Sequence, residues 1–139
     1  MADRWNDYNR TVVAEFRANG GRVGGQLQGL PVLVLTTMGA RSGLPREVPL
    51  VHHRDGDRLV VVGSKGGAPT DPDWCRNLRA NPGVTVELAD ERFRATATEA
   101  TGEERDRLFA AMASWAPNLD EYQRANLRTF PVFVIERAV

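Results

Sequence analysis

The chain has 139 residues, of which 42% are hydrophobic and 26% are charged, and its 18 basic side chains equal its 18 acidic ones in number. That length fits a single domain of roughly 100 to 150 residues, and the composition is typical of an ordered globular protein. A net charge of zero argues against binding to duplex nucleic acid through its phosphates. An aromatic content of 7% disfavours a groove that binds single-stranded nucleic acid.

No targeting or metal-binding pattern stands out. The longest apolar run, at 30–35, is far shorter than the roughly 20 residues that cross a membrane, and the first ten residues contain no apolar signal core. Cys75 is the only cysteine, so no internal disulfide can form, and structural zinc sites usually take two or more cysteines. We therefore expect a cytoplasmic protein without a metal site, in contact with the inner face of the membrane at most peripherally.

The N-terminal segment 1–19 is predicted to form an amphipathic helix, because apolar side chains recur at spacings of three and four. These side chains are Trp5, Tyr8, Val12, Val13 and Phe16. Glycines fill the segment 20–30 that follows, and the first of them can close the helix in a left-handed conformation. The helix face mixes acidic and basic residues, so packing on the rest of the domain, 31–139, is favoured over a membrane surface.

Six strands are predicted from short runs of apolar and β-branched residues. They lie at 31–37, 47–53, 58–64, 84–88, 93–99 and 131–136. Asp55 and Gly56 make a tight turn that joins the second and third strands into a hairpin. Because strands mostly follow one another without regular alternation with helices, we expect an α+β fold built on an antiparallel barrel or sandwich.

Three later helices are predicted from the residues that begin them. Asp71 can cap a helix whose first residue is Pro72. Thr101 and Glu104 have the spacing of a capping box. The expected helices are 72–81, 102–115 and 119–127.

Nucleophilic and acid–base catalysis have little support in the sequence. His52 and His53 are adjacent on a predicted strand, so they point to opposite faces and cannot easily share a metal or a substrate atom. Each is expected to be a surface or pocket-lining side chain. Cys75 is expected to pack in a helix, because nothing near it in the sequence would lower the pKa of its thiol.

A loop at 38–45 carries groups that suit an anion. An arginine fork binds two phosphate oxygens at once, and a turn that contains glycine exposes backbone amides. The residues concerned are Arg41, Ser42, Gly43 and, just beyond the loop, Arg46. Such a short motif in isolation is more often a turn with solvated arginines.

A second loop makes the anion site more plausible. It follows another buried strand and contains a hydroxyl, a cation and two glycines, so a flat ligand could come close to its backbone. Its residues are Ser64, Lys65, Gly66 and Gly67. Together the two loops predict a pocket for an anionic, partly planar cofactor, which would supply the chemistry that the side chains lack.

Four ordered motifs run through the chain: T-T-x-G-x-R-S-G from Thr36, S-K-x-G from Ser64, P-x-W-x-x-N-L-x-A-N-P from Pro72 and R-x-x-P-V from Arg128. This set resembles the deazaflavin-dependent nitroreductase family of actinobacterial proteins over nearly the whole chain. The resemblance implies a split β-barrel like that of FMN-binding oxidases. It also implies that reduced 8-hydroxy-5-deazaflavin, coenzyme F-420, passes a hydride to an organic acceptor such as a quinone, enone or nitroaromatic compound.

The resemblance also assigns roles to individual positions. The phosphate and acidic tail of the coenzyme would be held by Arg41, Ser42, Gly43 and Arg46. The ring would be lined by Ser64, Lys65, Gly66 and Gly67, and bordered by Trp74 and Asn77, which share one helix face. Trp74 could equally be a core anchor. The acceptor pocket would be formed by Val51, Ala116, Leu119 and Tyr122, of which Tyr122 could also donate a proton.

This chain departs from the family pattern at positions that affect the expected coenzyme affinity and the expected acceptor. Ala40 stands where the nitroreductase-active member has a basic residue, so a lower coenzyme affinity is expected. Of the several tyrosines around the substrate of that member only Tyr122 is matched, which favours a quinone over a nitroimidazole. An FMN-dependent oxidoreductase on the same barrel and a non-catalytic binder of the coenzyme or of an apolar ligand remain alternatives. A homodimer is possible, because split barrels often dimerise.

Overall fold

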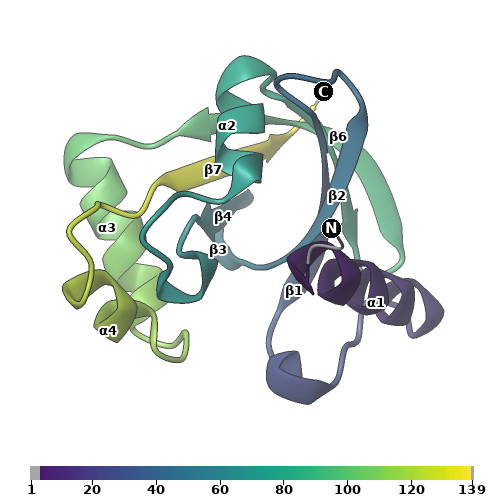
Figure 1. Ribbon diagram of the computed structural model, residues 1–139, viewed down its shortest axis with the longest axis horizontal. Helices are drawn as coiled ribbons and strands as arrows, with labels where there is room; N and C mark the ends of the chain where they lie inside the picture. The colour runs from purple at the N-terminus through teal and green to yellow at the C-terminus, as the bar shows by residue number, and fades with distance from the viewer. Residues whose placement is uncertain (1–3, 139) are drawn as a thin grey trace.

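The computed structural model describes the backbone of residues 4–138 and the side chains from residue 7 onward (Figure 1). The predicted apolar position of Trp5 therefore lies outside the described side chains. The helices are α1 Arg4–Ala18, α2 Asp73–Ala80, α3 Gly102–Ala113 and α4 Leu119–Arg124, with short 3-10 turns η1 Gly25–Leu27 and η2 Lys65–Gly67. The strands are β1 Val32–Met38, β2 Pro45–Val51, β3 His53–Asp55, β4 Arg58–Val62, β5 Gly83–Leu88, β6 Glu91–Glu99 and β7 Val132–Arg137.

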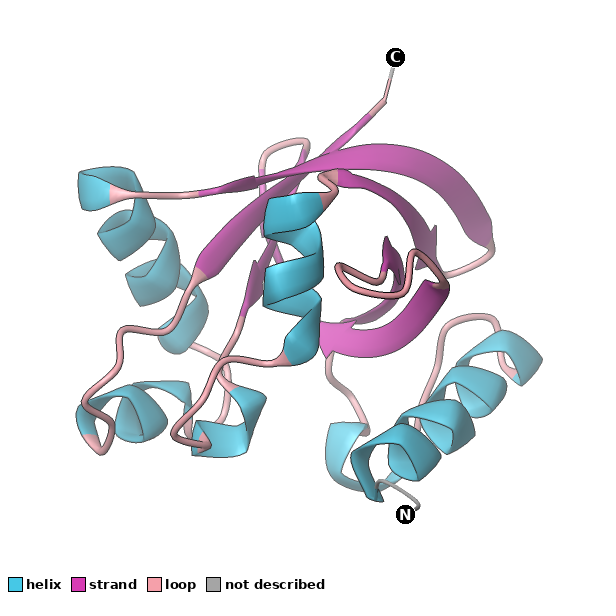
Figure 2. Cartoon of the chain, turned by 45° about the horizontal axis from the view of Figure 1, so that its top comes forward, coloured by secondary structure: helices cyan, strands magenta, loops and turns pink. Residues whose placement is uncertain are grey.

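The strands form one antiparallel sheet of seven, in the order β2-β1-β5-β6-β7-β4-β3. The prediction of six strands was wrong, because the expected strand 47–53 is divided between β2 and β3. These two strands pair with β1 and β4 at opposite edges of the sheet, and only His52 separates them. The sheet must therefore curl until these two strands come close at His52, which produces the half-barrel visible in Figure 2. The α+β class and the hairpin at Asp55 and Gly56 are confirmed.

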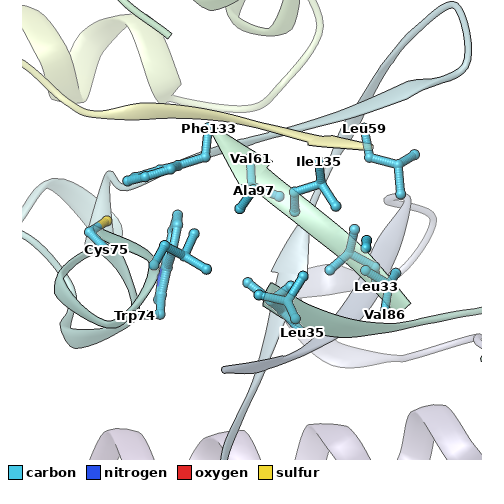
Figure 3. Packing of buried hydrophobic residues seen from close by; sticks show 13 residues of the cluster. Leu33, Leu35, Leu59, Val61, Trp74, Cys75, Val86, Ala97, Phe133 and Ile135 are labelled. Carbon is cyan, nitrogen blue, oxygen red and sulfur yellow. The ribbon is translucent and has the colours of Figure 1, made fainter. Parts of the chain in front are cut away.

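The alternation of side chains along each strand explains where the core lies. Leu33 and Leu35 of β1 join a cluster on the concave side of the sheet, whereas Val32 and Val34 face the opposite way, toward α1. The concave cluster draws residues from five strands and is completed by Trp74, Cys75 and Leu78 of α2 (Figure 3). Alternate residues of β4 and β7 face α3 and α4 instead. Helices therefore cover both outer flanks of the half-barrel (Figure 1).

The predicted helix positions are confirmed, but two predicted caps are wrong. Pro72 is the N-cap residue of α2, not its first residue, and Asp71 makes an ion pair with Arg128 at 2.7 Å. Thr101 is the N-cap residue of α3 but makes no capping bond with its side chain, while Glu104 lies 3.5 Å from Arg58. Asp71 and Glu104 thus form ion pairs with residues that are distant in the sequence. No helix in the described part of the chain is long and apolar enough to cross a membrane.

Candidate functional site

A cavity of about 1000 Å³ opens between β2, the two predicted loops, α2 and the segment that joins α3 to α4. All of the predicted site residues except Gly43 and Gly67 line it. Those that do are Arg41, Ser42, Arg46, Val51, Ser64, Lys65, Gly66, Trp74, Asn77, Ala116, Leu119 and Tyr122. Residues from positions 41 to 122 thus come together in one space, as the sequence predicted.

One end of the cavity is basic. Arg41 and Arg46 line this end, and Lys65 lines the cavity from the second loop, next to α4. None of these three side chains has an ion pair or hydrogen bond with another described residue. The acidic residues among the described lining are Glu47 and Asp73, and both are already paired. Glu47 is bound by Arg17 of α1, and Asp73 by Arg76 of α2. Arg41 and Arg46 therefore create a positive region that suits phosphate or carboxylate groups, and Lys65 adds a positive charge at the second loop.

Hydrogen bonds within the 38–45 loop fix its shape. The Gly39 amide donates to the Leu44 carbonyl at 2.8 Å, and the Gly43 amide donates to the Gly39 carbonyl at 2.9 Å. The Ser42 hydroxyl accepts from the Leu44 amide at 3.1 Å. Gly43 takes a left-handed φ of 69°, so its role is to allow this turn, not to line the cavity.

Asn77 ties α2 to this loop. Its side-chain oxygen accepts from the Ala40 amide at 2.9 Å, and its side-chain nitrogen donates to the Thr37 hydroxyl at 3.1 Å. The residue is only 8% exposed, and both polar atoms of its side chain have a hydrogen-bond partner. Although Asn77 borders the cavity, its observed hydrogen bonds hold Ala40, the residue that precedes Arg41 in the loop.

Trp74 combines the two roles that the sequence left open. It lies in the concave core, with its ring edge toward Phe133 at a centroid distance of 5.7 Å (Figure 3). It also lines the cavity. A rigid aromatic wall anchored in the core is well suited to support a flat ligand.

The second loop has an unusual backbone. Lys65, Gly66 and Gly67 take φ angles of 49°, 63° and 86°, so three successive residues are left-handed. Gly67 lies outside the cavity lining, and a Cβ there would come within 3.0 Å of the Tyr122 ring. Gly67 is therefore needed for the packing of Tyr122, which itself lines the cavity.

The other end of the cavity is apolar. Val51, Ala116 and Tyr122 pack against the cluster under α3 and α4 that contains Leu119. Val51 and Arg46 lie at opposite ends of β2, about 17 Å apart at roughly 3.4 Å per residue. Arg46 and the apolar region at Val51 are thus separated by approximately the length of one strand.

The structure brings to this cavity several residues for which no site role was predicted. Tyr8 and Asn9 of α1 line it, as do Leu27 and Leu30 of the glycine-rich segment. The Arg128 side chain holds the second loop by binding backbone carbonyls of that loop. The motif R-x-x-P-V, which begins at Arg128, was the sequence feature that could have indicated a role for this residue. A motif alone does not show which carbonyls an arginine binds.

The residues judged unsuited to catalysis lie outside the cavity lining. Cys75 is fully buried in the concave core, which confirms a packing role, and this burial raises the pKa of its thiol to about 12. The His53 Nδ1 accepts from the Trp115 indole at 2.9 Å. The prediction for His52 was wrong, because its side chain is only 4% exposed and lies neither at the surface nor in the pocket. No group of acidic, histidine and cysteine side chains among the described residues could hold a metal ion.

A family model described as F420H(2)-dependent quinone reductase matches residues 8–137. The chain belongs to this family. A quinone reductase of that description from Mycobacterium tuberculosis is 38% identical over 89% of this chain and 86% of its own length. The resemblance indicated by the ordered motifs is therefore confirmed, together with the prediction of an oxidoreductase family that uses the reduced deazaflavin coenzyme.

Two solved structures are similar to most of this chain. One, described as an F420-H2 dependent reductase, is 39% identical with a TM-score of 0.71 and covers 76% of this chain and 94% of its own. Another, described as a domain-swapped dimer, is 35% identical with a TM-score of 0.73 and covers 94% of this chain and 98% of its own. The fold of about three quarters of this chain is thus shared with an F420-H2 dependent reductase.

Proposed function

We propose that this protein is a deazaflavin-dependent reductase whose acceptor is a quinone or a similarly apolar, flat molecule. The observation that carries the proposal is one cavity that combines an apolar end with three cations, Arg41, Arg46 and Lys65, none of which is paired with another described residue. When bound, the reduced coenzyme supplies a hydride to the acceptor. The chain itself supplies binding and orientation, which are effective where two reactants must meet at short range.

The residues of the basic end fit the coenzyme's tail. Arg41 and Arg46 would hold its phosphate and carboxylates through charge-assisted hydrogen bonds, with Ser42 adding a hydroxyl. Lys65 would add a third positive charge near the ring. Because Ala40 contributes only a backbone amide, and that amide is bound to Asn77, we propose fewer tail contacts than in family members with a second basic residue there.

The other end of the cavity fits an apolar acceptor. Val51, Ala116 and Leu119 would exclude water from the acceptor's flat face, and Tyr122 would form the adjoining wall. The Tyr122 ring is fixed against Gly67, so it borders both the second loop and the acceptor pocket. From this place its hydroxyl could supply the proton that accompanies the hydride.

Two wider proposals accompany this function. The half-barrel corresponds to a split β-barrel of the FMN-binding type, forming one domain over 1–139. The protein also forms a homodimer, as the solved relative described as a domain-swapped dimer suggests. A mass of about 15.4 kDa in sedimentation would contradict the dimer.

Fluorescence titration with the oxidised coenzyme tests the tail assignment. Replacing Arg41→Ala and Arg46→Ala together removes two charge-assisted contacts, each worth on the order of 1.5 to 3 kcal/mol, so the dissociation constant should rise by at least about a hundredfold. Arg94→Ala is a matched control, because Arg94 is an exposed arginine on β6 that does not line the cavity.

An unchanged affinity in the double variant would contradict the tail assignment. Oxidation of the reduced coenzyme by a panel of quinones, followed by absorbance, tests the reaction itself. If the wild-type protein binds the coenzyme but no quinone oxidises it faster than in buffer, the protein is a binder and not a reductase.

A further inference from the structure

Arg128 makes an unusually complete set of contacts with the loop that follows β4. Its Nε donates to the Ala68 carbonyl at 3.0 Å, and its Nη2 donates to the carbonyls of Ser64 at 2.9 Å and Ala68 at 2.8 Å. Its Nη1 donates to the Gly63 carbonyl at 2.9 Å and to an Asp71 carboxylate oxygen at 2.7 Å. These bonds use all five N–H donors of the guanidinium.

The segment before β7 holds the loop from one side. The Asn126 side chain donates to the Gly67 carbonyl at 2.7 Å, so Asn126 and Arg128 together bind the carbonyls of residues 63, 64, 67 and 68. The Arg128 guanidinium also stacks on Phe130 at 4.5 Å, and its side chain is only 15% exposed. Its position is therefore fixed by packing as well as by hydrogen bonds.

The loop needs such a restraint. A left-handed φ is unfavourable for a residue with a side chain, yet Lys65 adopts one, between Ser64 and two further left-handed residues. The turn also brings several carbonyl oxygens close together, and their partial negative charges repel unless a cation lies among them. Arg128 supplies that cation through bonds directed by its planar shape.

We propose that Arg128 is a positioning residue: by binding the carbonyls of loop 63–68 it holds Ser64, Lys65 and Gly66 in place against the ring of the coenzyme. This inference rests on the proposed function for the identity of the ligand. It concerns a residue that does not line the cavity and acts only through the loop.

Arg105 offers a closely matched control. Its side chain is 14% exposed, stacks on Phe109 at 4.6 Å, and donates to the Phe130 carbonyl at 2.8 Å. It differs from Arg128 in that none of its contacts reaches loop 63–68. Lysine in either position keeps the charge but loses the planar fork and two of the five donors.

The test compares Arg128→Lys with Arg105→Lys. In the free protein, hydrogen exchange should accelerate at least about tenfold at the Gly67 and Ala68 amides, which bond to Ser64 and Lys65, only in Arg128→Lys. In titrations, Arg128→Lys should weaken coenzyme binding by about tenfold, and kcat at saturating coenzyme should also fall because the ring is held less accurately. Arg105→Lys should lower the melting temperature without either effect.

Unchanged exchange at these two amides, or an equal loss of affinity in both variants, would overturn the role of Arg128. A wild-type protein that fails to bind the coenzyme would instead overturn the proposed function. In that case the exchange comparison would still report whether Arg128 holds the loop, so the two failures are distinguishable.

Discussion

His52 is a buried histidine at the point where β2 ends and β3 begins. Its backbone amide donates to the Pro31 carbonyl at 3.0 Å, and its Nδ1 has no hydrogen-bond partner among the described residues. Burial, together with the nearby charges of Arg54 and His53, lowers the pKa of its imidazole from 6.5 to about 4. Folding therefore requires the neutral form.

The unfolding free energy should fall as the pH is lowered from 7 to 5. The unfolded chain takes up a proton near pH 6.5, whereas the folded protein resists it until about pH 4, so stability is lost in this interval. The expected loss is about 2 kcal/mol, measured by urea unfolding at the two pH values. His52→Leu should remove most of this dependence and His53→Leu should keep it. If the unfolding free energy of His52→Leu falls between pH 7 and pH 5 by as much as that of the wild-type protein, His52 is not the cause.

Arg17 links whole elements, since it joins α1 to two strands. Its guanidinium donates to Glu87 of β5 at 2.9 and 2.7 Å and also binds Glu47 of β2. These contacts raise the pKa of Arg17 and lower that of Glu87. Because α1 also brings Tyr8 and Asn9 to the cavity, Arg17 helps to place one wall of the site.

Arg17→Met should therefore destabilise the protein by about 1 to 3 kcal/mol in urea unfolding. The Glu87 side chain is only 12% exposed and would lose its charged partner, which is costly in a partly buried place. Arg10→Met is the control, since Arg10 pairs with Asp7 on the exposed side of the same helix and should cost less than about 1 kcal/mol. Equal effects of the two changes would contradict a bridging role for Arg17.

For the whole molecule, the cavity lies among elements from both halves of the sequence. A ligand that fills it contacts α1, β2, α2 and the segment between α3 and α4, and so binds only the folded chain. Binding at a hundred times the dissociation constant adds about 2.7 kcal/mol to the unfolding free energy.

The oxidised deazaflavin coenzyme should accordingly raise the melting temperature by several degrees in a thermal-shift measurement. FMN has a similar flat ring and a phosphate but lacks the acidic tail, so at the same concentration it should raise the melting temperature less. A larger shift with FMN would favour the alternative FMN-dependent enzyme.

Local patterns predicted most of the secondary structure. The strand at 31–37 was recognisable because its side chains are apolar and β-branched, and such runs favour a buried strand wherever they occur. The predicted capping by Asp71 failed because a partner from residue 128 binds the carboxylate instead. Likewise, Asn77 was placed near the site correctly, but its bonds to Thr37 and Ala40 depend on a packing that helical spacing does not reveal.

The sequence alone determined the α+β class, the two anion-suited loops and the family, because each element, loop and motif consists of residues that are neighbours along the chain. Only the tertiary structure decided that the predicted strand 47–53 divides at His52, since that break arises from pairing with both edges of a curled sheet. It also decided the function of Arg128, whose contacts span 57 to 65 residues of sequence. Such contacts depend on how the sheet closes, and no local pattern encodes that closure.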